Sequence, residues 1–197
     1  MLKKLALSAL IATSAMAMHQ GEININDKDL EAQLRLDMGQ FNEVTEPDTV
    51  FVGFRYLNAD KENSDYSEDP DLYEINFLMQ QPVRANNALT LGIGAKFEYT
   101  DLGDEDFMAL PLGLEASFLL PADGFVPIYL NGNVYFAPKV LSFKEGERYF
   151  EYKISVDAEI IDNGRITAGY RNIETKYKGA GNQDLNNAWF VGFKVAF

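Results

Sequence analysis

The chain has 197 residues, of which 47% are hydrophobic and 24% are charged, and its formal net charge is −13. This length predicts a single domain, and this composition is too polar for a bundle of membrane-spanning helices. The acidic balance argues against binding to nucleic acid or to an anionic membrane surface, because both attract clusters of Lys and Arg. No Cys is present, so the fold contains no disulfide.

The first segment, residues 1–17, has the pattern of a secretory signal peptide. Lysines give a positive start, residues 5–12 are apolar, and small residues precede a cleavage site after Ala17. The apolar run is too short for a membrane-spanning helix, which needs about 20 apolar residues. We therefore predict that the signal peptide is removed and that residues 18–197 form one barrel domain.

From Leu30 onward, apolar side chains fall on alternate positions in segments separated by clusters of Gly, Asn, Asp and Pro. This pattern indicates β-strands joined by turns. Nine segments have it: residues 30–38, 49–58, 71–81, 88–100, 107–120, 126–137, 148–161, 164–175 and 187–197. Single-chain bacterial barrels have even strand counts. The short segment Gly21–Asn26 would make ten strands, whereas an early segment outside the wall would leave eight.

Strands of this kind form either a soluble barrel with the apolar face inside or a membrane barrel with the apolar face toward lipid. Strands of soluble proteins most often have about five or six residues. A tilted strand needs about nine to eleven residues to cross the hydrocarbon layer, and these segments are long enough. We predict an all-β fold, a small antiparallel transmembrane up-and-down barrel of about ten strands. Eight strands and a soluble periplasmic lipocalin-like binding barrel are the alternatives.

The polar faces of the predicted strands carry small residues and charges of both signs, Glu31 and Asp37 among them. Small residues suit a crowded lumen, and opposite charges can pair there. We expect the following side chains to face the lumen: Arg35, Arg55, Glu74, Lys96, Glu98, Glu115, Glu151, Lys153, Asp157, Glu159, Arg171 and Lys194.

The predicted turns alternate in length and polarity, as in a membrane barrel with short periplasmic turns and longer outer loops. The compact turns are at residues 80–88, 121–127 and 162–164, and the more polar loops are at 58–71, 103–106, 138–147 and 176–187. Aromatic residues near strand ends would form an interfacial girdle: Tyr56, Tyr73, Tyr99, Phe107, Phe136, Phe150, Tyr170 and Trp189.

The last predicted strand ends on an aromatic residue. Its apolar face is formed by Trp189, Val191, Phe193, Val195 and Phe197. A terminal strand of this form resembles the assembly signal of bacterial outer-membrane barrels, which the barrel insertion machinery reads as an added edge strand. We therefore expect a protein of the outer membrane of a Gram-negative bacterium. Its expected partners are the insertion machinery, membrane lipid and lipopolysaccharide, and we expect a monomer.

Several stretches together resemble the YfaZ family of outer-membrane proteins. These are Arg55–Asp60 with the acidic loop after it, Leu91–Lys96, Ala168–Arg171 and Val191–Phe193. The resemblance covers most of the predicted mature chain. It implies an outer-membrane barrel and supplies no catalytic residues to transfer.

Three classes of function follow from such a barrel. In the first, the lumen is filled by paired charges and the barrel has a structural or interaction role, since small barrels are largely filled by side chains. The same residues would alternatively line a narrow cation-favouring porin or channel.

In the second class of function, acidic loops bind a divalent cation through carboxylates, although they lack the glycine of an EF-hand loop. These carboxylates are Asp60, Glu62, Asp65, Glu68, Asp69 and Asp71 in one loop and Asp101, Asp104, Glu105 and Asp106 in another.

The third class, an outer-membrane enzyme, has little support in the sequence. The single His, His19, lies outside the nine clear strands, so a Ser nucleophile has no His base within the barrel wall. Carboxylate chemistry by Glu98 and Glu115 on adjacent strands stays open. A zinc site would lack its usual Cys and His ligands. We expect no enzymatic activity, no cofactor and no defined metal site.

Overall fold

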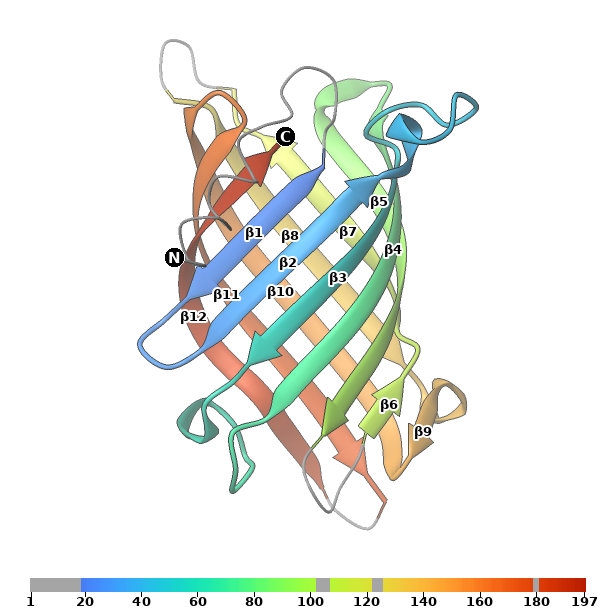
Figure 1. Cartoon of the computed structure of the whole chain (residues 1–197), viewed down its shortest axis with the longest axis vertical. Coiled ribbons are helices and arrows are strands. Elements are labelled where there is room, and N and C mark those ends of the chain that lie inside the picture. The colour runs from blue at the N-terminus through green and yellow to red at the C-terminus, as the bar shows by residue number, and fades with distance from the viewer. Residues whose placement is uncertain (1–18, 102–106, 122–125, 179–180) are drawn as a thin grey trace, which may run out of the picture.

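The computed structural model describes residues 19–101, 107–121, 126–178 and 181–197. The predicted signal peptide and the acidic loop at 103–106 lie outside the described residues. Within them the chain is all-β, and ten antiparallel strands close into a barrel, with two further short strands outside the ring (Figure 1). The prediction of ten strands rather than eight is confirmed.

The strands follow one another around the ring in sequence order. They are β1 (Gln20–Ile25), β2 (Leu30–Asp37), β3 (Val50–Asn58), β4 (Asp71–Val83), β5 (Asn86–Asp101), β7 (Leu112–Leu119), β8 (Ile128–Ala137), β10 (Gly146–Ile161), β11 (Gly164–Tyr177) and β12 (Asn182–Ala196).

The ring closes between β1 and β12, where Gln20 lies opposite Ala196 and Ile25 lies opposite Val191. His19 and Phe197 extend this seam, because the N–H of each donates to the carbonyl oxygen of the other at 3.0 and 2.9 Å. The short N-terminal segment is therefore the first strand of the barrel.

Two short strands, β6 (Phe107–Ala109) and β9 (Ser142–Lys144), pair with each other outside the ring, and β6 also pairs with β5. The single strand predicted over 107–120 is thus divided into β6 and β7. The reason is Pro111, which has no N–H to donate and restricts the backbone of the residue before it. The N–H of that residue, Leu110, donates to the carbonyl of Leu141 at 2.8 Å.

In the described parts of the connections lie three single-turn 3-10 helices: η1 (Met38–Gln40), η2 (Lys61–Asn63) and η3 (Lys139–Leu141). Among the described residues, no helix is long and apolar enough to cross a membrane.

The barrel has two different ends. The terminal end, at the top of Figure 1, contains the chain's C-terminus and the connections 38–49, 84–85 and 162–163. The far end contains the turn 26–29 and the connections 59–70 and 138–145. Connection lengths differ from the predicted alternation at two places, because 38–49 is long although it lies at the terminal end, and 26–29 is short although it lies at the far end.

The long connection 38–49 is held by the buried carboxylate of Asp37. This carboxylate accepts hydrogen bonds from the N–H groups of Gly39, at 2.9 Å, and Asp48, at 3.0 Å. Burial and the negative charge of Asp37 raise the pKa of Asp48. The connection is therefore folded back onto the end of β2 and the mouth of the barrel.

The outward faces of the strands form an apolar belt, as the alternation predicts. Ile93 is 54% exposed and Trp189 is 71% exposed, although both are large apolar side chains. Aromatic rings follow one another across neighbouring strands toward the far end, in the runs Tyr56, Tyr73, Tyr99 and Tyr152, Tyr170, Trp189. The expected position of Phe107 in the girdle is wrong, because its side chain is fully buried inside the barrel.

Candidate functional site

The interior of the barrel is the candidate site, because the inward faces of its strands bring most of the buried polar side chains together. From the far end to the terminal end the interior has three layers. An apolar layer is followed by a layer of ion pairs, and a polar hollow then opens at the terminal end.

The first layer, the apolar cap, fills the lumen at the far end. Its centre is Phe107, whose ring stacks on that of Tyr149 and meets that of Tyr177 edge-on, at centroid distances of 5.9 and 5.8 Å. Its buried members are Leu57, Ala59, Leu72, Phe107, Ala109, Ala137, Tyr149, Ile173, Tyr177 and Leu185. These residues lie on the same inward faces as the charged residues in the middle of the strands. Leu57, for example, is two residues after Arg55 and therefore points to the same side of β3.

The second layer begins with the carboxylate cluster, formed by Glu74, Glu98 and Glu151 around Arg55 and Lys96. Arg55 Nη1 lies 2.5 Å from Glu151 Oε1, and its Nη2 lies 2.5 Å from Glu74 Oε2. Lys96 Nζ lies 2.6 Å from Glu151 Oε2 and 3.1 Å from Glu74 Oε2. All five side chains are buried. The cluster therefore holds one more carboxylate than cations.

Glu98 has the weakest contacts in this cluster. Its Oε1 lies 3.5 Å from Arg55 and 3.9 Å from Lys96, and it accepts a hydrogen bond from the Tyr149 hydroxyl at 3.2 Å. Its Oε2 has no hydrogen-bond partner among the described residues, although it is buried. The cluster thus joins the cap through the hydroxyl of Tyr149.

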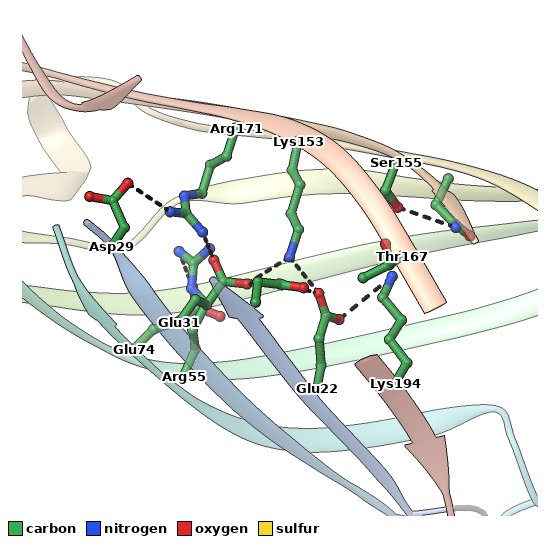
Figure 2. Close-up of polar contacts among 12 residues, drawn as sticks. Glu22, Asp29, Glu31, Arg55, Glu74, Lys153, Ser155, Thr167, Arg171 and Lys194 are labelled. Carbon is green, nitrogen blue, oxygen red and sulfur yellow. Dashed lines mark hydrogen bonds and ion pairs between the residues drawn. The ribbon is translucent and has the colours of Figure 1, made fainter. Parts of the chain in front are cut away.

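A second set of charges, the charge row, follows the lumen wall with alternating sign (Figure 2). Lys153 Nζ lies 2.6 Å from Glu31 and 2.7 Å from Glu22. Lys194 continues the row, with its Nζ 3.6 Å from Glu22 and 2.9 Å from Asp157. At the other end of the row Arg171 pairs with Glu31 and approaches Asp29. Opposite charges alternate throughout, so each buried charge has a partner that offsets its desolvation.

Two further pairs lie closer to the terminal end. Arg35 and Glu115 form two parallel hydrogen bonds of 2.9 and 3.1 Å across the lumen, and the Tyr135 hydroxyl donates to Glu115 at 2.6 Å. Near the rim, Arg165 lies 3.0 Å from Glu159. The two parallel bonds to Glu115 fix the orientation of the Arg35 guanidinium in addition to neutralising its charge.

The third layer is a polar hollow, which we call the vestibule. It consists of two adjoining cavities of about 210 and 240 Å³ that share Gln20, Glu22, Gln33, Arg35, Gln80 and Lys194 in their walls. The deeper one reaches Lys153 and Asn133, and the shallower one reaches the rim at Asn163 and Ala196. The vestibule is therefore open at the terminal end and ends at the ion pairs.

A model of the family described as YfaZ precursor matches residues 3–197. The chain belongs to the YfaZ family. No curated protein matches the chain. The description as a precursor is consistent with a segment that is removed, as predicted for residues 1–17, and the closed ring of strands gives this YfaZ protein its architecture.

The structure places the predicted lumen residues of this YfaZ barrel at three levels. The buried ones are Arg55, Glu74, Lys96, Glu98, Glu151, Lys153, Asp157 and Arg171. Arg35 and Glu115 pair across the vestibule and are partly buried, whereas Glu159 and Lys194 are more exposed and lie toward the rim. The residues of the predicted assembly signal lie on the outward face of β12 and its end. They are Trp189, Val191, Phe193, Val195 and Phe197.

Sequence reasoning missed Glu22 and Asp29, which are members of the charge row, and the apolar cap. Glu22 lies in the short first strand, whose role in the wall was left open. The cap follows from strand parity, because Leu72 and Tyr149 share inward faces with Glu74 and Glu151. An apolar side chain on a predicted lumen face was the available signal.

The carboxylates of Glu74, Glu98 and Glu151 are close enough to hold a metal ion, with one oxygen of each within 4.8 Å of the others. Arg55 and Lys96 contact these same oxygens, however, and their positive charges would repel a divalent ion. We therefore assign no metal to the cluster.

The far end of the YfaZ barrel is covered by the connection 59–70, which we call the lid. It bends over the low side of the wall, where β1 and β2 have only 6 and 8 residues. Asp65 and Asp184 bind each other through two hydrogen bonds of 2.8 Å, and the Tyr66 hydroxyl bonds to Thr175 at 2.6 Å. The acidic loop proposed as a cation site is thus attached to the barrel by its own backbone and side chains.

Asp29 anchors the lid. Its buried carboxylate accepts hydrogen bonds from the Asp60 N–H at 2.8 Å, the Asn63 amide at 3.1 Å and the Asn186 amide at 2.8 Å. Burial by itself raises the pKa of Asp29, but these hydrogen bonds outweigh it and lower the pKa below its ordinary value. The ionised Asp29 carboxylate therefore stabilises the folded protein at pH values above its ordinary pKa. This stabilisation is lost as the pH falls through the lowered pKa.

Replacing Asp29 by Ala is expected to release the lid and to cost about 1–3 kcal/mol, because the buried Asn186 amide and two part-buried donors of the lid lose their acceptor. Trypsin cleavage after Lys61, followed by mass spectrometry on the folded barrel, measures the release. The matched control is Asp27→Ala, which removes an exposed carboxylate from the same turn. Equal cleavage in the two variants would contradict the anchor role.

Proposed function

We propose that this YfaZ protein is an integral β-barrel of the outer membrane of a Gram-negative bacterium. The observation that carries this proposal is the inverted polarity of the wall. Along β5, Ile93 is 54% exposed on the outside while Glu98 is fully buried on the inside. A soluble sandwich or barrel has the opposite arrangement, and a water-soluble surface rarely exposes an apolar patch of more than a few hundred Å². The arrangement supports lipid rather than water as the outer solvent.

The pairing of β1 with β12 brings the first and last strands of the barrel together at the terminal end, and this suggests an orientation in the membrane. In single-chain bacterial barrels both ends of the chain lie in the periplasm, so the terminal end would face the periplasm. The far end, with the lid and its acidic side chains, would face outside. Its expected neighbours are membrane lipid and lipopolysaccharide, and insertion would depend on the barrel assembly machinery through β12. We propose a monomer.

We further propose a structural or interaction role with a lumen closed toward the outside. The apolar cap supports it, because its buried side chains come from strands on several sides of the ring and lie next to the carboxylate cluster. The alternative, a narrow cation-favouring channel, is supported by the excess carboxylate of that cluster. Ions would nevertheless have to displace the cap and break several buried ion pairs, and removing one partner of such a pair costs about 3–5 kcal/mol.

Planar-bilayer recording separates the two roles. The purified protein is expected to give no discrete conductance steps. A variant that opens both layers, with Phe107→Ala and Tyr149→Ala in the cap and Arg55→Ala and Glu151→Ala in the cluster, is expected to give them, because it removes the stacked rings and a buried ion pair beneath them. Phe136→Ala is the matched control, since it removes an aromatic ring from the outward face. Reproducible steps from the unmodified protein would establish the channel instead.

A gel assay tests the membrane proposal itself. A folded outer-membrane barrel is expected to run faster in an unheated sample than in a boiled one and to sediment with the outer-membrane fraction. A protein that remains in the soluble periplasmic fraction and shows no heat-dependent shift would favour the lipocalin-like alternative.

We propose no enzymatic activity. The two carboxylates considered for acid-base chemistry form ion pairs with different cations. Glu98 lies beside Arg55 and Lys96, and Glu115 is bound by Arg35. Each carboxylate thus has a structural partner. His19 contacts the rim, where its Nδ1 accepts from the Asp37 N–H at 3.0 Å and its ring stacks on Phe41.

A further inference from the structure

The vestibule has the geometry of a binding pocket that is reached from one side only. Its rim includes Asn163 in the β10–β11 turn and Ala196 at the end of β12, and its floor is formed around Lys153. Its two cavities, of about 210 and 240 Å³, together fall in the lower part of the ~300–1,000 Å³ range of small-molecule pockets. A ligand of one or two ring units would fit, and it would enter and leave through the terminal end.

The charges in the wall of the deeper cavity are already paired. Arg35 is bound in two-pronged fashion by Glu115, Lys153 lies between Glu22 and Glu31, and Lys194 is bound by Asp157. A charged ligand would therefore have to compete with a carboxylate or a cation that is already satisfied. The pocket favours a ligand without net charge.

Some of the uncharged polar groups in the wall are free to bind such a ligand, whereas Gln80, Asn131 and Ser155 already have partners. Among the described residues, the side chains of Gln33, Thr90 and Ser117 have no hydrogen-bond partner, and all three line the deeper cavity. Two buried atoms of the same wall are also unpaired, the acceptor Asn133 Oδ1 and the donor Arg35 Nε. Buried polar atoms without partners are rare, since each costs about 1–3 kcal/mol.

Free donors and free acceptors are mixed in this wall. A hydroxyl group both donates and accepts, so a molecule with several hydroxyls can bind the Gln33 amide and the Thr90 and Ser117 hydroxyls together. We propose that the vestibule binds a neutral polyhydroxylated molecule of sugar-ring size from the terminal end. The same chemistry is offered by a free sugar and by the end residue of a glycan chain.

The test is calorimetric titration of the refolded barrel in a zwitterionic detergent, because a detergent with a sugar head group would compete. The probes are glucose and N-acetylglucosamine as free sugars, and N-acetylglucosamine trimer as a glycan end. Saturable millimolar binding is expected for at least one probe. Trimer binding at least ~tenfold tighter than monomer binding, about 1.4 kcal/mol, would assign the site to a glycan end. Similar affinities would assign it to a free sugar.

Two substitutions remove wall groups that the ligand would contact. Asn133→Leu and Gln33→Leu are each expected to weaken binding by roughly tenfold, as expected for a lost hydrogen bond to a buried group. Gln81→Leu is the matched control, because Gln81 is exposed and outside both cavities of the vestibule. Ser117→Ala is a milder test that keeps the fold if a Leu variant fails the heat-dependent gel shift.

No saturable binding of any probe by a barrel that shows the heat-dependent gel shift would overturn the vestibule site, and it would leave the membrane proposal untouched. Binding that persists unchanged in all three wall variants would also overturn the site. Failure of the gel shift in the unmodified protein would instead count against the barrel proposal, so the two failures are distinguishable.

Discussion

Replacement of Arg55 by Met is expected to destabilise the barrel by about 3–5 kcal/mol, the cost of removing one partner from a buried ion pair. Arg55 contacts all three carboxylates of the cluster, with Glu151 at 2.5 Å, Glu74 at 2.5 Å and Glu98 at 3.5 Å. Without it Lys96 alone would face three buried carboxylates. The measurement is the midpoint of urea unfolding in lipid vesicles, followed by tryptophan fluorescence.

The control for this result is Arg84→Met, the same chemical change at an exposed position in the turn after β4, which is expected to stay within about 0.5 kcal/mol. The double variant Arg55→Met with Glu151→Gln returns the cluster to its native excess of one carboxylate over cations. It is expected to be more stable than the sum of the two single variants predicts, with a coupling energy of about 0.5–3 kcal/mol. Strictly additive effects would show that the cluster does not act as a unit.

Replacement of Ile93 by Arg tests the surroundings of the wall. Ile93 lies near the middle of β5 and points outward. An Arg on the lipid face near the bilayer midplane costs about 2–4 kcal/mol, so we expect a loss of assembled barrel of that size in the same unfolding measurement.

The matched control for this substitution is Val44→Arg. Val44 is 91% exposed in the connection 38–49, which would lie in water, so its change is expected to stay within about 0.5 kcal/mol. If Ile93→Arg were equally harmless, the belt would be exposed to water and the soluble barrel would be the correct interpretation.

Strand parity explains why much of this interior could be predicted from sequence. Once Ile154 and Val156 are assigned to the outward face, Lys153 and Asp157 must point inward, because successive side chains of a strand alternate. The same rule places Leu72 beside Glu74, so the apolar cap was within reach of the pattern. The cap was not predicted because the inward faces were expected to carry only charged and small residues.

Other features depend on contacts between distant strands and could not be predicted. Arg35 on β2 meets Glu115 on β7 across the lumen, at a sequence separation of 80 residues, and the stagger of the whole barrel sets that pairing. The lid is a similar case, since Asp29 binds Asn186 at a separation of 157 residues. The division at Pro111 could be anticipated locally, because proline within a strand removes a ladder hydrogen bond.

The seam between β1 and β12 also bears on the order in which the wall is built. Along the ring, every other pairing joins strands that follow one another in the sequence, whereas the seam joins Ile23 to Phe193. The entropic cost of closing a loop rises with the logarithm of its length, so this contact is expected to form last. Until then both edge strands carry unpaired backbone groups, which hydrocarbon cannot satisfy. In the proposed membrane, an open sheet would therefore need another strand edge to pair with until the seam closes.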